Sequence, residues 1–415
     1  MTETLRVCMI SPDFLPVWSG IGAYTVSLLE NLPRDVDVHL LTVKREIPRS
    51  SLKSDALEAN ARAFEAVGKR VSIHFVSYAK NTFSYNLNFQ LSCVRALTGI
   101  CKEHRIDLIH SNFPLMSDIF AKLFSRIRIP SVATVQSTID GQHFGVKGAG
   151  ASIGELEQSD VANLVLYQPL RMLELLYVRK TPYYIAISKS VKREFMRYLG
   201  VDEKRIKIIY HGVDTHLFDA GREKNYTFDT ERFESFPTIT FSGRFVATKG
   251  ITVLLEAIPH VLKRFSEATF VFVGGGNFEP YLHYLRKLGV PSENIMVLGY
   301  LNFFDMPAIY SKSTICVVPT TYEPLGIRVM EAMSCERPVI ASAIGGIPEI
   351  ISHEHDGLLV PPKNSQSLAA SILRLLDNPP LAQKLGKNAR KTIIEKFSVS
   401  KMVEETFDFF RKVAR

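Results

Sequence analysis

The chain has 415 residues, of which 46% are hydrophobic and 22% are charged, and this balance excludes a disordered protein and fits roughly two to three folded domains. No apolar run reaches the ~20 residues that span a bilayer, and five cysteines without a CxxC pair fit reduced thiols. We expect a cytoplasmic protein without a signal peptide. The net charge of +8 falls almost entirely in residues 1–213, yet no basic run is interleaved with aromatic residues, which argues against a nucleic-acid partner.

Strand-like and helix-like segments alternate along the first half of the chain. Short β-branched runs predict strands at 5–10, 36–42, 71–76, 106–110, 131–135, 183–188 and 206–210. Most of the intervening stretches are amphipathic and predict helices. Strands that alternate with helices indicate a parallel sheet that is covered on both faces.

The second half repeats this organisation. Residues 214–236 are polar and patternless, which predicts a linker, and further strands are expected at 238–243, 268–276, 294–300, 314–320 and 338–342. We therefore expect two Rossmann-like, doubly wound α/β domains in tandem, at 1–213 and 237–395. Ligands are expected at the carboxyl ends of strands and in a central cleft between the domains. Residues 396–415 are expected to form a helix.

Three turns after predicted strands carry residues that suit phosphate binding. Gly20 and Gly22 precede a helix, where glycine permits close approach and the helix N-terminus attracts anions, although any tight strand-to-helix turn has a similar sequence. Arg244 and Lys249 lie in a glycine-bounded loop, and either neutralise a diphosphate or form a solvated surface pair. Gly275 is the centre of a three-glycine turn after the next strand.

Residues 322–342, YEPLGIRVMEAMSCERPVIAS, place two glutamates eight positions apart. If a helix begins near Gly326, Glu323 lies just before its positive end and Glu331 lies inside it. A structural interpretation pairs Glu331 with Arg328 at i,i+3, which is worth only a few tenths of a kcal/mol. A functional interpretation notes that the apolar neighbours of Glu331 make an unpaired carboxylate costly, whereas the hydroxyl groups of a ligand satisfy it.

Taken together, these motifs resemble the retaining glycosyltransferases of family four. The spacing of Glu323 and Glu331 matches the E-x7-E signature, and EAM, PVIAS, GGIPEII and HDGLLVPP follow in family order. Upstream, SGRFVATKG resembles the Arg/Lys loop of the family, and YHGVDTHLF (210–218) resembles its NGVD segment. The resemblance covers nearly the whole chain. It implies a GT-B fold, with the helix at 396–415 returning to the N-terminal domain.

The resemblance also implies an activity and a set of site residues. It implies metal-independent transfer of a hexose from a UDP- or GDP-sugar, with Glu323, Arg244 and Lys249 as catalytic residues. The two cations would contact the diphosphate, Glu323 would face the sugar, and Glu331 would hold the ribose hydroxyls. The other donor-binding residues would be Gly20, Gly22, Gly275, Leu325, Gly326 and Ile327.

The N-terminal domain departs from the family pattern at positions that we assign to the acceptor. Gln136 stands where a histidine is frequent near the reacting sugar, and glutamine hydrogen-bonds a hydroxyl but does not titrate. Asn112 replaces the second histidine of an HxH pattern that His110 begins. His143, in the glycine-rich segment 141–154, is a third candidate for contact with the acceptor.

The sequence leaves the acceptor open. The basic N-terminal half fits a membrane lipid or polyprenyl-linked glycan, with the protein at the inner face of the membrane, and it fits a soluble sugar or sugar phosphate equally well. The apolar stretch 164–178 is either an acceptor element or a core helix. Gln136 also leaves a non-catalytic nucleotide-sugar-binding protein as an alternative. The DVD at 35–37 starts a predicted strand rather than following one, and the HEHD at 353–356 falls in a loop, so no metal site is expected.

Overall fold

The computed structural model describes residues 4–15, 20–45, 54–79, 82–112, 118–124, 127–150, 156, 158–221, 233 and 235–415. Most of the predicted linker, residues 222–232 and 234, therefore lies outside the described residues. The chain divides into two compact units. The first unit consists of Met1–Asp140, Tyr167–Gly212 and Val399–Arg415, and the second unit consists of Gly141–Leu166 and Val213–Ser398.

The first unit is built on a seven-stranded parallel sheet with the strand order β3-β2-β1-β4-β5-β6-β7. Its strands are β1 (Leu5–Ile10), β2 (Val36–Arg45), β3 (Val71–Ala79), β4 (Leu108–Asn112), β5 (Ser131–Val135), β6 (Tyr183–Ala186) and β7 (Ile206–Ile208). All seven lie at the predicted places. The central strands β4 and β5 are buried along their whole length, as expected for strands that are covered on both faces.

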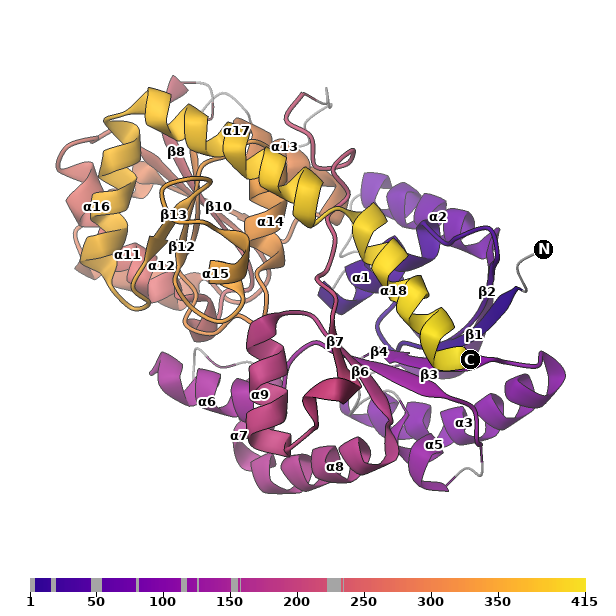
Figure 1. The fold of residues 1–415 in the computed structure, drawn as a ribbon. Coiled ribbons are helices and arrows are strands. Elements are labelled where there is room, and N and C mark those ends of the chain that lie inside the picture. The colour runs from indigo at the N-terminus through magenta and orange to yellow at the C-terminus, as the bar shows by residue number, and fades with distance from the viewer. Residues whose placement is uncertain are drawn as a thin grey trace. The chain divides into compact units, whose positions relative to one another are not determined.

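Helices flank this sheet. Those of the first unit are α1 (Gly20–Glu30), α2 (Ser54–Gly68), α3 (Thr82–Glu103), α5 (Ile119–Phe124), α8 (Tyr167–Lys180), α9 (Lys189–Leu199) and α18 (Val399–Ala414). The last helix, α18, packs against α1, β4 and β5 (Figure 1). It buries Met402, Phe407 and Phe410, and the Phe410 ring lies 4.9 Å from that of His110 on β4. The amphipathic C-terminal segment is thus part of the first unit.

The second unit contains a six-stranded parallel sheet with the order β10-β9-β8-β11-β12-β13. Its strands are β8 (Thr238–Ser242), β9 (Thr269–Val273), β10 (Ile295–Gly299), β11 (Ile315–Val318), β12 (Val339–Ser342) and β13 (Leu358–Val360). Its helices are α7 (Gln158–Val165), α11 (Ile251–Leu262), α12 (Glu279–Lys287), α13 (Met306–Lys312), α14 (Ile327–Ser334), α15 (Ile347–Ile350), α16 (Ser365–Leu376) and α17 (Pro379–Lys396). The helix α6 (Ile139–Ala149) begins in the first unit and ends in the second.

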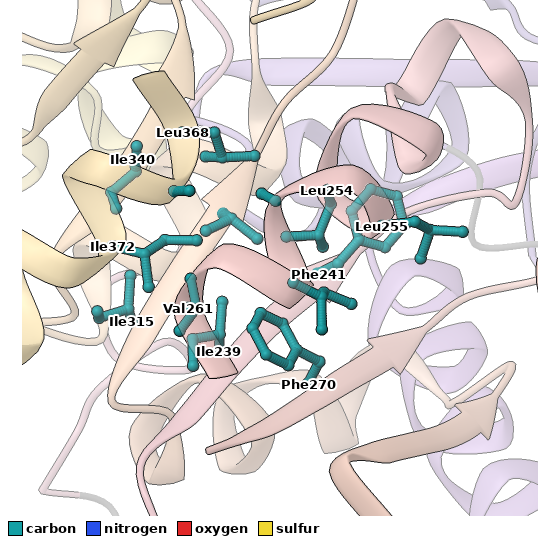
Figure 2. Close-up of a cluster of buried hydrophobic side chains, with 14 of the residues drawn as sticks. Ile239, Phe241, Leu254, Leu255, Val261, Phe270, Ile315, Ile340, Leu368 and Ile372 are labelled. Carbon is teal, nitrogen blue, oxygen red and sulfur yellow. The ribbon is translucent and has the colours of Figure 1, made fainter. Parts of the chain in front are cut away.

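A hydrophobic core fixes the second sheet to the helices α11 and α16. Side chains such as Phe241 on β8 and Phe270 on β9 meet Leu254 of α11 and Ile372 of α16 (Figure 2). Each such side chain contributes about 1.5–3 kcal/mol when it leaves water completely. This packing holds the carboxyl ends of the strands, and the turns that follow them, at fixed places along one edge of the sheet.

Two parts of the chain differ from the sequence-based expectation. The strand β13 was not expected, because it has only three residues and follows a charged loop. Residues 141–166, which we assign to the N-terminal domain from sequence, belong to the second unit. There Lys363 donates a hydrogen bond to the carbonyl of Gly148, and a Cβ at Gly145 would lie 2.5 Å from the Tyr322 ring. Among the described helices, none has the length and apolarity that a bilayer crossing requires.

Candidate functional site

The candidate site lies at the point where the strand order of the second sheet reverses. From β8 the chain adds β9 and β10 on one side, and β11 and then β12 on the other. The loops that follow β8 and β11 leave the sheet in opposite directions at this point, which is where open α/β sheets bind ligands. The loop after β8 carries Arg244 and Lys249, and the loop after β11 carries Glu323.

Backbone contacts hold these two loops against each other. The carbonyl of Thr248 accepts hydrogen bonds from the Thr321 N–H at 2.9 Å and from the Thr320 hydroxyl at 2.7 Å. Gly250 has φ +69°, and a Cβ at this residue would lie 1.8 Å from the carbonyl oxygen of Pro319. Only glycine therefore permits this close approach of the two backbones.

An ion pair joins the same two loops. Nζ of Lys249 lies 2.7 Å from Oε2 of Glu323, and the two side chains are 27% and 16% exposed. Arg244 lies five residues before Lys249 in the same loop and is exposed. The structure thus brings a predicted cation and a predicted acid into direct contact, with the second cation in the same loop.

A second backbone contact supports Glu323 from the side of β12. Gly345 has φ +59°, and a Cβ there would lie 1.8 Å from the carbonyl oxygen of Glu323. The N–H of Gly346 donates to the same oxygen at 3.1 Å. The GG pair of the sequence motif GGIPEII therefore fixes the backbone that carries Glu323.

Glu331 lies inside α14 and is buried, as its apolar neighbours suggested. Its Oε2 accepts a hydrogen bond from the Tyr310 hydroxyl at 2.9 Å and an ion-paired one from Nη1 of Arg328 at 2.7 Å. Tyr310 also lies 2.8 Å from the hydroxyl of Ser242, the last residue of β8. Within the described part of the chain, Oε1 of Glu331 has no hydrogen-bond partner. One carboxylate oxygen is therefore fixed and the other is available to a ligand.

Charge and burial fix the protonation states of Tyr310 and Arg328. Burial and the Glu331 carboxylate raise the pKa of Tyr310 well above its ordinary value, so its hydroxyl remains a donor at neutral pH. Burial lowers the pKa of Arg328, but the carboxylate of Glu331 and the hydroxyl of Tyr310 raise it by more, and the guanidinium stays charged. The i,i+3 pair that the sequence suggested is present.

The helix α14 begins at Ile327, directly after Gly326, as the sequence predicted. Gly326 has φ +115°, and its neighbour Leu325 is buried. The first N–H groups of a helix have no acceptor inside it and attract anions. These N–H groups lie between Glu323 and Glu331 in the sequence, so the segment offers both donors and acceptors to a ligand.

In the turn after β9, the neighbours of Gly275, and not Gly275 itself, lack space for a side chain. Gly274 and Gly276 have φ +156° and +119°, and a Cβ at Gly274 would lie 1.7 Å from the carbonyl oxygen of Gly243. A Cβ at Gly275 would meet only the Tyr300 ring, at 3.9 Å, and its carbonyl accepts from the Phe245 N–H at 2.8 Å. Gly275 therefore has space beside its α-carbon.

The remaining predicted residues lie on other elements of the two units. Gly20 and Gly22 are in the first turn of α1, in the first unit, and His143 lies buried on α6, in the part of that helix that belongs to the second unit. In the first unit, Nε2 of Gln136 donates to Oδ1 of Asn112 at 2.9 Å. Nδ2 of Asn112 donates in turn to the Thr25 hydroxyl at 2.8 Å. Asn112 and Gln136 are thus brought together at the carboxyl ends of β4 and β5.

Two family models match successive parts of the chain. "Glycosyltransferase Family 4" matches residues 18–217, and "Glycosyl transferases group 1" matches residues 223–392. The chain belongs to glycosyltransferase family 4. This family 4 glycosyltransferase is 28% identical over 414 residues to a glycosyltransferase of Methanocaldococcus jannaschii, and the match covers 98% of each chain.

Solved structures show the same GT-B fold of two Rossmann-like domains. Sucrose-phosphate synthase of Thermosynechococcus elongatus superposes with a TM-score of 0.75 at 21% identity, over 98% of each chain. HepE of Anabaena, in complex with UDP-glucose, superposes with a TM-score of 0.70 at 19% identity, over 98% of the family 4 chain and 100% of HepE. At these identities the likeness establishes the fold.

Sequence reasoning missed two contributors to the site. Tyr310, which holds Glu331, lies on α13 and is separated from it by 21 positions, so no local pattern connects the two. Gly345 was noticed only as part of a motif, and its contact with the Glu323 backbone depends on the pairing of β11 with β12. The available signal in the sequence was a glycine pair that follows the predicted strand 338–342 after two residues.

Proposed function

We propose that the protein transfers a sugar from a nucleotide sugar to an anionic acceptor, with retention of the anomeric configuration. The observation that carries the proposal is the Lys249–Glu323 ion pair, together with a buried Glu331 on the following helix that has one available oxygen. A nucleotide sugar presents a diphosphate, a sugar and a ribose. The second unit has a group that suits each of them: two cations for the diphosphate, an acid before a helix for the sugar, and an acceptor oxygen for the ribose.

Each part of the donor has a group that suits it. Lys249 and Arg244 neutralise the diphosphate, whose charge grows as the bond to the sugar breaks, and electrostatic stabilisation of this kind contributes most of the rate enhancement in many group transfers. Glu331 accepts the ribose hydroxyls through Oε1, and Glu323 contacts the sugar. The two cations take the role that a divalent metal has in other transferases. The complex of HepE with UDP-glucose supports a UDP-sugar as the donor.

The acceptor is held by the first unit and carries negative charge. By sequence the first unit has 30 Lys and Arg against 20 Asp and Glu, whereas the second has 20 against 22. A surface with this excess attracts an anionic molecule. Gln136, held in place by Asn112, presents an amide to an acceptor hydroxyl. A sugar phosphate and a lipid-linked phosphate both satisfy these requirements.

Thermal-shift measurements with UDP-, GDP- and ADP-glucose test the donor. One of them is expected to raise the melting temperature of the wild type and to leave that of Lys249→Ala and Glu331→Gln unchanged, because a ligand stabilises the state that binds it. If none of a broader set of nucleotide sugars shifts the melting temperature, the proposal fails.

Product analysis tests the reaction itself. With the identified donor and a panel of sugar phosphates and lipid phosphates, NMR of the product is expected to show the anomeric configuration of the donor. An inverted product would refute retention. Full turnover in excess EDTA is expected, and a loss that added Mg²⁺ restores would refute metal independence. Binding of the donor without turnover on any acceptor would leave the non-catalytic alternative.

A further inference from the structure

Outside the candidate site, the first unit has a surface that combines exposed apolar side chains with cations. We call it the α3–α5 surface. It contains two hollows: Leu91, Arg95 and Phe124 line one, and Lys122, Arg128 and Lys180 line the other. Neither the donor site nor Gln136 uses any of them.

The larger hollow is mainly apolar, although Arg95 and Glu103 are among its lining residues. It has a volume of about 950 Å3 and lies between β3, α3 and the end of α5. Phe124 and Leu91 at its edge are 69% and 53% exposed. On α3, Leu87, Leu91 and Arg95 are spaced at i, i+4 and i+8, so they lie along one face of the helix. Apolar groups of this size in water favour any partner that covers them, at ~25 cal/mol per Å2.

The smaller hollow is cationic. It has a volume of about 300 Å3 and is lined by Lys122, Arg128 and Lys180. Its only acid among the described lining residues is Asp118, which lies 3.5 Å from Nζ of Lys122 and also accepts from the Tyr177 hydroxyl at 2.8 Å. Arg128 and Lys180 make no ion pair or hydrogen bond with the described residues. The pocket therefore has more positive charge than its own carboxylate can balance.

The two hollows form one surface, because the same helices line both. On α5, Lys122 lines the cationic pocket and Phe124 lines the apolar hollow. The helix α5 packs between α3 and α8 (Figure 1). On α8, Met172, Leu176 and Lys180 again have the spacing i, i+4 and i+8, and Met172 is 67% exposed. The stretch 164–178 is therefore not a plain core helix, since α8 presents an apolar stripe that leads to the pocket.

We propose that the α3–α5 surface docks on an anionic lipid bilayer. The phosphate of a lipid headgroup enters the pocket formed by Lys122, Arg128 and Lys180, and Leu91 and Phe124 insert among the acyl chains. Charge complementarity selects this partner, because the first unit has ten more basic than acidic residues and Glu103 is the only acid among the described residues that line the apolar hollow. Basic residues next to apolar ones are the combination that anionic membranes bind.

This surface lies away from the edge of the sheet that carries Gln136. Ser131, which accepts a hydrogen bond from Lys122 at 3.0 Å, is the first residue of β5, and Gln136 follows the last one. The pocket therefore lies at the amino end of the strand and the acceptor candidates lie at its carboxyl end. Docking through the α3–α5 surface leaves the carboxyl edge of the first sheet uncovered.

Flotation of the full chain with vesicles tests the proposal without reference to activity. Binding is expected to vesicles of phosphatidylcholine and phosphatidylglycerol, to be much weaker to phosphatidylcholine alone, and to decrease with salt. Arg128→Ala/Lys180→Ala is expected to bind about 25-fold more weakly, at roughly fivefold for each cation. Leu91→Ser/Phe124→Ser is expected to lose binding, and both variants should keep the wild-type melting temperature because all four side chains are exposed.

Matched variants in the second unit provide the control. Lys384→Ala/Lys387→Ala removes two exposed cations, and Ile394→Ser removes an exposed apolar side chain, and neither change is expected to alter binding. Equal losses in the control and test variants would overturn the proposal, as would no binding to the anionic vesicles. Inorganic phosphate is a further probe: if it raises the melting temperature through Arg128 and Lys180 while vesicles do not bind, the pocket serves a soluble phosphate and the membrane proposal is wrong.

Discussion

Nζ of Lys249 and Oε2 of Glu323 lie 2.7 Å apart, which joins the loops that follow β8 and β11. Both side chains are partly exposed, and such pairs contribute only about 0–1 kcal/mol to stability. The backbone bonds of Thr248 and the glycine contacts already hold the loops together. The ion pair is therefore expected to contribute little to folding, and in the proposed function the donor's diphosphate replaces Glu323 as the partner of Lys249.

Replacing Lys249 should separate activity from stability. Lys249→Ala is expected to lower kcat by about 10²–10³-fold, because the charge that develops on the leaving diphosphate loses a donor. Its urea midpoint should stay within error of the wild type. The control is Lys263→Ala, which removes an exposed lysine directly after the end of α11. Full turnover by Lys249→Ala would exclude Lys249 from the reaction.

Tyr310 positions Glu331, so its hydroxyl should affect donor binding. Tyr310→Phe removes a hydrogen bond to a carboxylate, and we expect the free energy of unfolding to fall by about 1.5–3 kcal/mol. The KM for the nucleotide sugar is expected to rise about tenfold with little change in kcat, since a contact of the ribose is equally strong before and during the reaction.

A tyrosine elsewhere in the second unit gives the comparison. The Tyr284 hydroxyl donates to Glu256 at 3.3 Å, outside the site. Tyr284→Phe is expected to leave KM unchanged. If Tyr310→Phe lowers kcat and not the affinity for the donor, the role assigned to Glu331 is incorrect.

The contact of Gly250 with Pro319, directly after β11, predicts a large effect from one methyl group. Gly250 and Gly289 both have φ +69°, but a Cβ at Gly250 meets the Pro319 carbonyl at 1.8 Å, whereas a Cβ at Gly289 meets nothing within 4 Å. Gly289→Ala therefore measures the left-handed strain alone, about 1–2 kcal/mol. Gly250→Ala is expected to cost clearly more in urea unfolding and to lower turnover by displacing the loop that carries Glu323. If Gly250→Ala and Gly289→Ala lose equal stability, the two loops can move apart to accept a methyl group, and the predicted close contact is not important.

Buried histidines make the stability of the first unit depend on pH. Burial lowers the pKa of His211 to about 3, and among the described residues neither ring nitrogen has a hydrogen-bond partner. In the unfolded chain the pKa is about 6.5, so below that pH the unfolded state binds a proton that the folded state excludes. The free energy of unfolding due to His211 is then expected to fall by about 1.4 kcal/mol for each pH unit between about 6.5 and 3.

His211→Phe tests this pH dependence, because phenylalanine preserves the ring that stacks on Tyr24 at 4.4 Å. Urea unfolding at pH 7.5 and 5.5 is expected to show a smaller decrease for the variant than for the wild type. His110 has the same low pKa of about 3 and retains its own contribution in both proteins. An unchanged difference between the two pH values would show that His211 is protonated in the folded state.

The sequence predicted those features of the fold and of the candidate site that depend on local pattern. The strands β1 to β12 are β-branched runs bounded by turn residues, and the start of α14 at Ile327 follows from the glycine before it. The pairing of Arg328 with Glu331 follows from helical spacing.

Contacts between distant segments were not predictable in the same way. Tyr310 reaches Glu331 only because α13 packs against α14, and Gly345 touches the Glu323 backbone only because β12 pairs with β11. The inclusion of residues 141–166 in the second unit likewise depends on tertiary contacts. Neither hydrophobic periodicity nor turn residues indicate which of the two units a segment packs into.

The position of α18 has a consequence for the order in which the chain folds during synthesis. Residues 399–415 pack on α1, β4 and β5, although the whole segment 213–398 of the second unit separates them from the rest of the first. A ribosome therefore releases every residue of the second unit before it supplies the last helix of the first. Until then the surface that Phe407 and Phe410 cover is open to water and to chaperones. A chain cut short within its last 17 residues would contain a finished second unit and an unfinished first.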